Sequence, residues 1–593
     1  MTLFDWIIVI GLNGTIIAYG FYLSRNVVSS AEWFLAGRRL PWWMVGLSMY
    51  ATAIDSSDLV ADSGATYTLG FSYFTVNWIG VVAGWGLAAF LICLPMYRAG
   101  MYTNAEYLEA RFGPSARVLC ALIQVQYRTL VLGIIGMTLY LTIAIVCEWE
   151  PLYGWCAVGA VALLAAIYTA LGGLRSVAVT DALQFVVMTF AAIVIWVVVW
   201  NRVDGWAGME SRLAAADAGL PGQLLHAGHD NIARQDVSEL VGPGATAEDA
   251  EMLRRKLLIG GQYDSEDQVI SRRTPAWLVA IGFIIMGGAY SIVNHTQSMR
   301  MFAAKNEWHL KMSVFVAGTA MLVMSFVNLT MGIMGRALLP AQSDLPFERQ
   351  DTIYPWLVSQ IDTWGLQGIV VAGVLAAGLS TYDSIGSSLS ALLTRDIYAR
   401  LFVRDRDDRH YLRIGQLMTP LIIVISFLYI PFLEGGMLMF YLELTSTFVI
   451  PLLTLYIMGT FTRVHRLSGL VGLSVGAAYG VLRLCAPLLA ERVGIAVMPP
   501  FMTNTFAAYP ISLILTAGTM LAYSLLFGWE KPGELLHEER GAWLRRSQES
   551  IRRLATESAA SDPAQGMVVR LLPVVLAVIV VAAGCIFSFV VFW

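Results

Sequence analysis

The feature that most limits how this chain can fold is a recurring series of long apolar segments. We expect about fourteen of them, each close to the roughly 20 residues that a helix needs to cross a bilayer. They lie near residues 4–24, 44–66, 73–97, 118–147, 152–171, 181–200, 276–299, 312–335, 366–394, 414–432, 437–460, 468–488, 506–527 and 569–592. Only 13% of the residues are charged, about half the share found in soluble domains. The sequence therefore predicts an all-α polytopic membrane protein.

Basic residues in the loops indicate how these segments are oriented, because cytoplasmic loops are enriched in Lys and Arg. Such residues lie near 25–39, 98–117, 300–311, 395–413, 463–466 and 545–553. These loops fall on one side if both termini lie outside. We therefore expect a multi-pass protein of the cell (plasma or inner) membrane, in contact with membrane lipid. It would have an external loop at 201–275 and an amphipathic cytoplasmic segment at 528–568.

One apolar segment, Val371–Tyr398, has a row of polar side chains in its middle. Five of them recur at spacings of three and four, which places them on one helix face: Ser380, Asp383, Ser384, Ser387 and Ser388. A carboxylate near the bilayer centre costs roughly 2.5–3.5 kcal/mol even on the mildest scale, so such a residue usually faces a cavity or an ion. Hydroxyl and carboxylate oxygens suit a hard cation such as Na⁺. The row favours an ion site, and a polar seam between packed helices is the alternative.

Two other segments are interrupted at membrane depth. The run ATAIDSSDLVADSG places three aspartates within 44–66, and the run MGGAYSIVNHTQ places Gly287 and Gly288 within 276–299. Irregular backbone at this depth is tolerated only where it is buried in protein or lines a water-filled cavity. Interrupted helices in corresponding positions of two halves are typical of inverted-repeat secondary transporters. The alternative for each interruption is a helix kink that binds no ligand.

The two interruptions predict a five-plus-five inverted-repeat transporter core, in which the first and sixth core helices are discontinuous. The first repeat would span residues 44–200 and the second 276–460. The remaining parts would be a peripheral N-terminal helix at 1–25, the external loop 201–275, and peripheral C-terminal helices in 461–593, which include the cytoplasmic segment 528–568.

Five motifs, in order along residues 30–460, resemble the solute:sodium symporter family, which includes bacterial proline, sugar and sialic-acid carriers. They are EWFLAGRRLPWWMVGLSMYAT, TNAEYLEARFG, GGLRSVAVTDALQ, NHTQSMRMFAAKN, and LAAGLSTYDS followed by TRDIY. His295 and Met299 depart from the family's pattern. The resemblance implies the five-plus-five fold, alternating access around a central site, and Na⁺ as the coupling ion with no other cofactor or metal.

The resemblance also implies a main sodium site. In the family this site uses backbone carbonyls of the broken first core helix and hydroxyls of the eighth. The matching positions here are Ala51, Ile54, Ala377, Ser380 and Thr381.

Some members of the family have a second sodium site nearer the cytoplasm. Its positions match Asp181, Ser380, Asp383 and Ser384. Asp383 departs from the pattern, because members carry Ser or another small residue there. Two nearby carboxylates need a cation between them, so we predict a second Na⁺ or a proton at this site. Two alternatives stay open: Asp181 only caps a helix, because TD precedes an apolar run, or Asp383 is a structural acid with an unidentified basic partner.

The substrate pocket departs further from sugar-binding relatives. The expected ligands are Asp55, Ser57, Asp58, Asn77 and Glu443, and Tyr290 matches an inner-gate tyrosine. The lysine of the seventh core helix has no counterpart in 312–335. Buried carboxylates need partners, which a cationic or zwitterionic substrate would supply. Arg128, alone within an apolar helix, could pair with these acids or bind a substrate carboxylate. The alternative is that the acids pair only with Arg128 and backbone amides.

We therefore predict a sodium-coupled symporter that imports a small organic solute, with an amine, amino acid or other zwitterion favoured. A sugar or polyol symporter and a transporter-like solute sensor are the alternatives. The net charge of −4 argues against nucleic-acid binding, and no obligate protein partner is evident. The chain has no HExxH, P-loop or nucleophile elbow, so we do not expect an enzyme.

Overall fold

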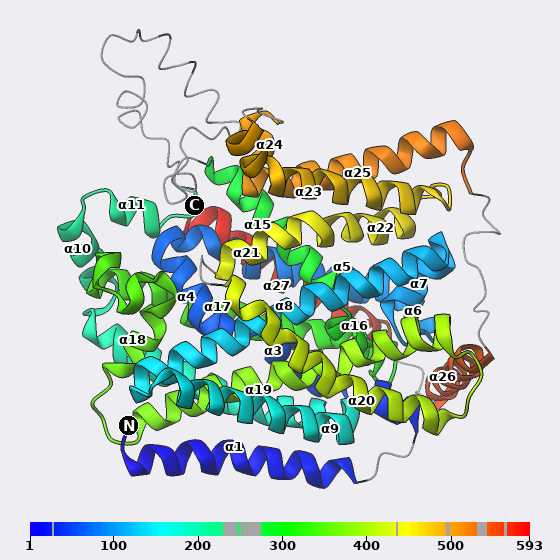
Figure 1. The fold of residues 1–593 in the computed structure, drawn as a ribbon, viewed down its shortest axis with the longest axis horizontal. Helices are drawn as coiled ribbons and strands as arrows, with labels where there is room; N and C mark the ends of the chain where they lie inside the picture. The colour runs from blue at the N-terminus through cyan, green and yellow to red at the C-terminus, as the bar shows by residue number, and fades with distance from the viewer. Residues whose placement is uncertain are drawn as a thin grey trace.

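The computed structural model describes residues 1–25, 29–228, 274–433, 437–493, 498–530, 542–561 and 566–593, with isolated positions at 246, 248 and 252. This part of the chain is helical throughout, without a β-strand, and contains 12 helices long and apolar enough to cross a membrane (Figure 1). They are α1 (Leu3–Ser24), Val76–Arg98 (η3, α5, η4 and α6), α8 (Pro114–Cys147), α9 (Pro151–Arg202), α15 (Ala276–Val293), α17 (Glu307–Leu338), α19 (Leu366–Leu392, extended to Phe402), α20 (Asp408–Ser426, extended to Phe432), Phe440–Phe461 (the end of α21, η10 and α22), α23 (Ser468–Val493), α25 (Thr505–Phe527) and α27 (Met567–Ile586).

The difference from the expected fourteen spans arises at two places. Segment 44–66 is divided into α3 (Trp42–Ala53) and α4 (Ser56–Leu69), which are both too short to count as full spans. The expected spans 152–171 and 181–200 lie on the two sides of a kink at Gly173 within α9, whose 52 residues count as a single span. A straight helix of that length would measure about 78 Å, more than twice the thickness of the hydrocarbon core. The count of fourteen therefore stays a prediction.

A kink at Gly173 divides α9 near its middle. Gly173 has φ 59° and ψ −165°, a conformation that only glycine adopts readily. A Cβ at this position would lie 2.6 Å from the carbonyl oxygen of Trp33. The glycine therefore permits both the bend and the close approach of the neighbouring chain.

Both predicted interruptions are present in the structure. The first is confirmed, because α3 ends at Ala53 and α4 begins at Ser56. The second also lies within the predicted run MGGAYSIVNHTQ: α15 runs unbroken through Gly287 and Gly288, and the break is at Asn294, where α16 (His295–Phe302) begins. Gly287 serves close packing, because an added Cβ would lie 2.5 Å from the carbonyl oxygen of Val76.

This packing gives a stability prediction with a matched control in the next residue. We expect Gly287→Ala to lower the stability of the protein by about 1–3 kcal/mol, because the methyl group would force the helices apart. Nothing lies within 4 Å of a Cβ at Gly288, so Gly288→Ala should be tolerated. Thermal unfolding of both variants in detergent tests this expectation, and equal melting temperatures would contradict it.

The polar row of α19 faces the protein interior. All five of its predicted members are fully buried, which confirms that the row does not face lipid: Ser380, Asp383, Ser384, Ser387 and Ser388. In the described part of the chain, α19 packs against α9, and it also contacts α3, α4 and α16 at the two helix breaks. The row therefore lies where the interrupted helices meet.

The connecting segments lie at opposite ends of the bundle. Helices α10 (Gly205–Ala216) and α11 (Leu220–Leu224) lie at the same end as the N-terminus, and α26 (Ala542–Ser561) lies at the other (Figure 1). Trp543 of α26 stacks on Tyr411 at 3.9 Å and donates to Asp408 at 3.1 Å. Helix α26, from the predicted segment 528–568, thus docks beside the arginine-rich loop 395–413. Most of residues 229–273 and part of 528–568 lie outside the described residues.

Candidate functional site

The break between α3 and α4 leaves carbonyl groups without helical partners. Ile54 is extended at φ −110° and ψ 112°, and Asp55 caps the start of α4. The Ser380 hydroxyl of α19 reaches the end of α3. It donates to the carbonyl oxygens of Ala51 at 2.9 Å and Ala377 at 2.8 Å. The structure thus brings Ala51, Ala377 and Ser380 together, with Ile54 at the break itself.

Thr381 is the one member of this predicted set whose hydroxyl has no hydrogen-bond partner among the described residues. It is fully buried, and leaving a buried polar group unsatisfied costs about 1–3 kcal/mol. Such a group needs an explanation, for which a bound ion is one of the accepted kinds. Hydroxyl and carbonyl oxygens at one helix break are the ligands that a hard cation takes. The residues present therefore fit Na⁺.

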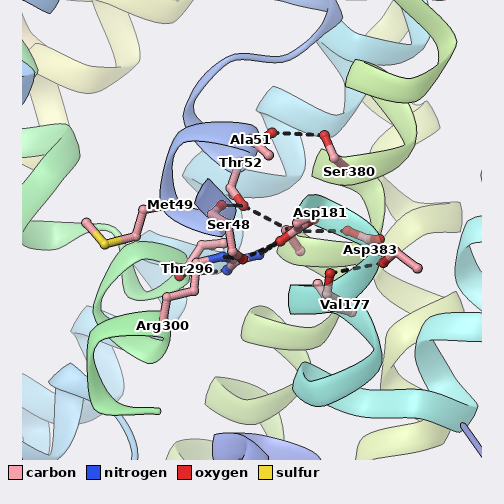
Figure 2. A network of polar contacts seen from close by, with 12 residues as sticks. Ser48, Met49, Ala51, Thr52, Val177, Asp181, Thr296, Arg300, Ser380 and Asp383 are labelled. Atoms are coloured by element: carbon pink, nitrogen blue, oxygen red, sulfur yellow. Dashed lines mark hydrogen bonds and ion pairs between the residues drawn. The ribbon is translucent and has the colours of Figure 1, made fainter. Parts of the chain in front are cut away.

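A second polar cluster lies beside the first and is organised around Arg300 of α16 (Figure 2). The Arg300 guanidinium donates from Nη2 to Asp181 Oδ2 at 2.9 Å and from Nε to Ser48 Oγ at 2.7 Å. Nη2 also donates to the Ser384 hydroxyl, and Nη1 donates to the Thr296 carbonyl at 2.9 Å. Arg300 and Asp181 are fully buried. The cluster therefore contains a buried ion pair between α16 and α9.

Asp383 lies at the edge of this cluster. Its Oδ2 accepts a hydrogen bond from the Tyr168 hydroxyl at 2.5 Å, and its Oδ1 accepts one from Ser384 at 3.0 Å. Within the described residues, no Lys or Arg nitrogen lies within ion-pair distance of its carboxylate. The structure thus brings together Asp181, Asp383 and Ser384 of the predicted second sodium site. The cation beside them is the Arg300 side chain.

The capping alternative for Asp181 is wrong. Asp181 lies well inside α9, because the helix continues through the region where a start was expected. Sequence reasoning also missed Arg300, which was noted only as one of several basic residues in loops. Its signal was its place directly after the expected span 276–299, since an arginine buried there requires an acidic partner. The acid lies 119 residues away, so the pair could not be matched by spacing.

A cavity of about 90 Å³ adjoins the first helix break, because Ala53 and Asp55 on either side of the break both line it. Four of the five predicted substrate ligands line it: Asp55, Ser57, Asp58 and Asn77. Asp62, Tyr73, Arg128, Gly287, Tyr290 and Tyr441 also contribute to its wall. The cavity therefore has a dense acidic side together with one arginine, which is the combination expected from the sequence.

Two of the acids also stabilise the start of α4. The Asp55 carboxylate accepts from the Ser57 amide at 2.7 Å, and the Asp58 carboxylate accepts from the Asp55 amide at 2.6 Å. This reciprocal arrangement is a capping box, which satisfies amide groups that the helix start would leave unpaired. The alternative from the sequence was that these acids bind only Arg128 and backbone amides. Its second half is correct, because both acids accept hydrogen bonds from backbone amides.

Arg128 of α8 does not pair with these acids. Among the described residues, no carboxylate lies within 4.0 Å of its guanidinium, and its Nε and Nη2 have no hydrogen-bond partner. Its charge lies 5.6 Å from the ring centres of both Tyr127 and Tyr290. Arg128 is 2% exposed, so water offers it little compensation. Arg128 also lines the cavity, so its charge lies beside the cavity without an acidic partner in the described part of the chain.

Glu443 of α21 (Met437–Leu444) is placed differently from the other predicted ligands. It is not among the residues that line the cavity. Its carboxylate forms an ion pair with Arg483 of α23 and accepts from the Thr505 hydroxyl of α25 at 2.8 Å. Sequence reasoning missed Arg483, because helices beyond the two repeats were expected to be peripheral. The structure thus supplies Glu443 with a partner inside the protein.

Tyr290, the predicted gate residue, lies between the cavity and the Arg300 cluster. It lines the cavity, and its hydroxyl donates to the Thr52 carbonyl at 3.2 Å. The Thr52 hydroxyl in turn donates to the Ser48 carbonyl at 2.7 Å and lies 3.2 Å from Ser384 Oγ. Its position is suited to a barrier between the two regions.

The model of the sodium:solute symporter family matches residues 33–476. The pig sodium/myo-inositol cotransporter 2 is 26% identical over 561 residues, covering 90% of this chain and 77% of the relative. The rat sodium/glucose cotransporter 2 is 27% identical over 496 residues, covering 78% and 68%.

Among solved structures, a substrate-bound, outward-open Na⁺-coupled sialic acid symporter has a TM-score of 0.69 to this chain. The match covers 89% of this chain and 99% of the symporter, at 18% sequence identity. At that identity the likeness shows that the two proteins share a fold.

Proposed function

The chain belongs to the sodium:solute symporter family, in which Na⁺ is the coupling ion, and we propose that it imports a small zwitterionic solute such as an amino acid or another amine by alternating access. The proposal concerns the substrate class, the residues that bind it, and the route of coupling.

The observation that favours a zwitterion is the presence of both charge signs in one buried cavity. Arg128, which has no acidic partner among the described residues, would donate to a carboxylate, and such charge-assisted hydrogen bonds are frequently bidentate. Asp55 and Asp58 on the same cavity offer acceptors to an ammonium group. A zwitterion would satisfy both sides at once, whereas either charge alone would leave the other unpaired. Ser57 and Asn77 would add neutral hydrogen bonds. Glu443 is left outside this set because Arg483 already pairs with it.

A sugar or polyol is the second candidate. The relatives with matching sequences are named as myo-inositol and glucose cotransporters. Carboxylates and an asparagine also accept and donate hydrogen bonds to hydroxyl groups. This candidate leaves the Arg128 charge without a counter-ion, and for that reason we place it second.

The proposed Na⁺ ligands are the carbonyl oxygens of Ala51, Ile54 and Ala377 and the hydroxyl oxygens of Ser380 and Thr381. They would tie the end of α3 to α19. The proposed solute ligands begin at Asp55, directly after the same break. Ion and solute would therefore order one segment together, and each would tighten the other, because binding coupling is reciprocal.

The remaining assignments follow the same proposal. Residues 44–200 and 276–460 would be the two inverted repeats that move against each other, with Tyr290 as the inner gate. The segments 1–25 and 461–593 would be peripheral, 201–275 would be external and 528–568 cytoplasmic. The protein would lie in the plasma or inner membrane with both termini outside.

A binding screen tests the substrate class. The purified protein is heated with amino acids, amines, sugars and polyols, each in Na⁺ and in choline. A bound ligand stabilises the folded protein by about 2.7 kcal/mol at a hundredfold excess over its dissociation constant. We expect zwitterions to raise the melting temperature in Na⁺ much more than in choline. Stabilisation by sugars or polyols alone would replace the first candidate with the second.

A further inference from the structure

The Arg300 side chain binds oxygen atoms of two residues of the predicted second sodium site, Asp181 and Ser384. It pairs with Asp181 at 2.9 Å and donates to the Ser384 hydroxyl. It also binds Ser48 at 2.7 Å and the Thr296 carbonyl at 2.9 Å, and in the described part of the chain none of its nitrogen atoms is left without a partner. A guanidinium is charged at every relevant pH and holds oxygen atoms in a fixed planar arrangement. The pocket is thus filled by a fully satisfied cation.

The oxygens left over do not make a second ion site. The Ser380 hydroxyl points to the Ala51 and Ala377 carbonyls, towards the first site. Asp383 already accepts hydrogen bonds from Tyr168 and Ser384. A hard cation needs several oxygen ligands, and one carboxylate does not provide them. The residues present therefore do not fit a second Na⁺ while Arg300 stays in place.

We propose that Arg300 is the resident cation of this position, so that the protein binds one Na⁺ per transport cycle, at the Ser380–Thr381 site. The inference rests on the proposed function, since it concerns the ion coupling of the same symporter. Two neighbouring carboxylates require a cation, and here the chain supplies it. A second Na⁺ would meet a like charge at close range. Arg300 thereby determines how many ions accompany the solute.

The arrangement also gives Arg300 a place in the conformational cycle. It lies on α16, directly after the second helix break, and its partners Ser48 and Asp181 lie on α3 and α9. Arg300 therefore links the proposed second repeat to the first through its own side chain. A link through bound Na⁺ would instead be lost each time the ion is released. The ion pair should persist when Na⁺ is removed, unlike a contact made through bound Na⁺.

The first measurement is the ratio of ²²Na⁺ to labelled solute taken up by proteoliposomes, with the Na⁺ dependence of thermal stability in detergent. We expect a ratio of one in the wild type. The free energy of unfolding should then rise with the logarithm of Na⁺ concentration at the slope for one ion. A ratio of two would overturn the inference and leave Na⁺-coupled symport intact. Absence of Na⁺-driven uptake would instead overturn the proposed function.

Variants at Arg300 separate its charge from a merely structural role. Arg300→Gln removes the charge and frees Asp181, so a second Na⁺ should enter: the stability slope should double, and Na⁺ but not choline should restore stability. Arg300→Lys keeps the charge and should keep the slope of one ion. Adding Asp181→Asn to Arg300→Gln removes both charges and should return the slope to one. A folded Arg300→Gln protein that still binds a single Na⁺ would contradict the proposal.

Discussion

Asp58→Asn is expected to weaken solute binding by roughly ten- to a hundredfold. The change keeps the shape of the side chain, and its remaining oxygen can still accept from the Asp55 amide, so the cap of α4 should survive. What is lost is the negative charge facing the cavity. A hydrogen bond to a charged group contributes about 1.5–3 kcal/mol, more than a neutral one. Isothermal titration with the solute identified in the screen measures the loss.

Glu443→Gln is the matched control for this prediction. Glu443→Gln also removes the charge of a carboxylate. That carboxylate contacts Arg483 and Thr505 and does not line the cavity. We expect the change to lower thermal stability, because one member of an ion pair is removed, and to leave solute affinity close to that of the wild type. If Asp58→Asn binds normally while Glu443→Gln does not, the proposed solute site is misplaced.

Thr381→Val is expected to weaken Na⁺ binding at the first site while sparing the Na⁺-free protein. Valine has the shape of threonine, and the hydroxyl it removes has no partner among the described residues. Without Na⁺, the loss of an unsatisfied buried group should be neutral or stabilising. With Na⁺, one of the proposed oxygen ligands is missing. We expect the Na⁺ concentration for half-maximal uptake to rise at least about tenfold, equivalent to about 1.4 kcal/mol.

Ser387→Ala is the control for the same helix. The Ser387 hydroxyl donates to the Ser384 carbonyl of its own helix at 3.1 Å, away from the first break. Its removal should leave the Na⁺ dependence unchanged. Ser380→Ala should resemble Thr381→Val in Na⁺ dependence, and because coupling is reciprocal the solute should no longer tighten Na⁺ binding. Normal uptake at low Na⁺ by both the Ser380 and the Thr381 variants would contradict the site.

The residues that could be anticipated from the sequence were those set by local pattern. Helical spacing placed Ser380, Asp383 and Ser384 on one buried face, and the run of polar residues after Ala53 located the first break. Length and hydropathy located most of the spans. These features depend on neighbours in the chain or on the bilayer, so a single sequence contains them.

The sequence did not predict the roles of residues that depend on contacts between distant segments. Gly287 was read as a break, but its role is set by the Val76 backbone, more than two hundred positions away. Arg300 and Arg483 each find a carboxylate on another helix, and no spacing reveals which one. The kink of α9 lies at Gly173, between the expected spans 152–171 and 181–200, but the close approach of the Trp33 backbone to that glycine could not be predicted from the sequence.

The most direct test of the account is solute uptake into sealed proteoliposomes driven only by an imposed Na⁺ gradient. With Na⁺ outside and choline inside, we expect the solute to accumulate above its external concentration, and collapse of the gradient should release it. Thr381→Val, reconstituted at the same density, should accumulate little at the same Na⁺ concentration. Saturable solute binding without accumulation in the wild type would contradict the account and identify a solute sensor instead.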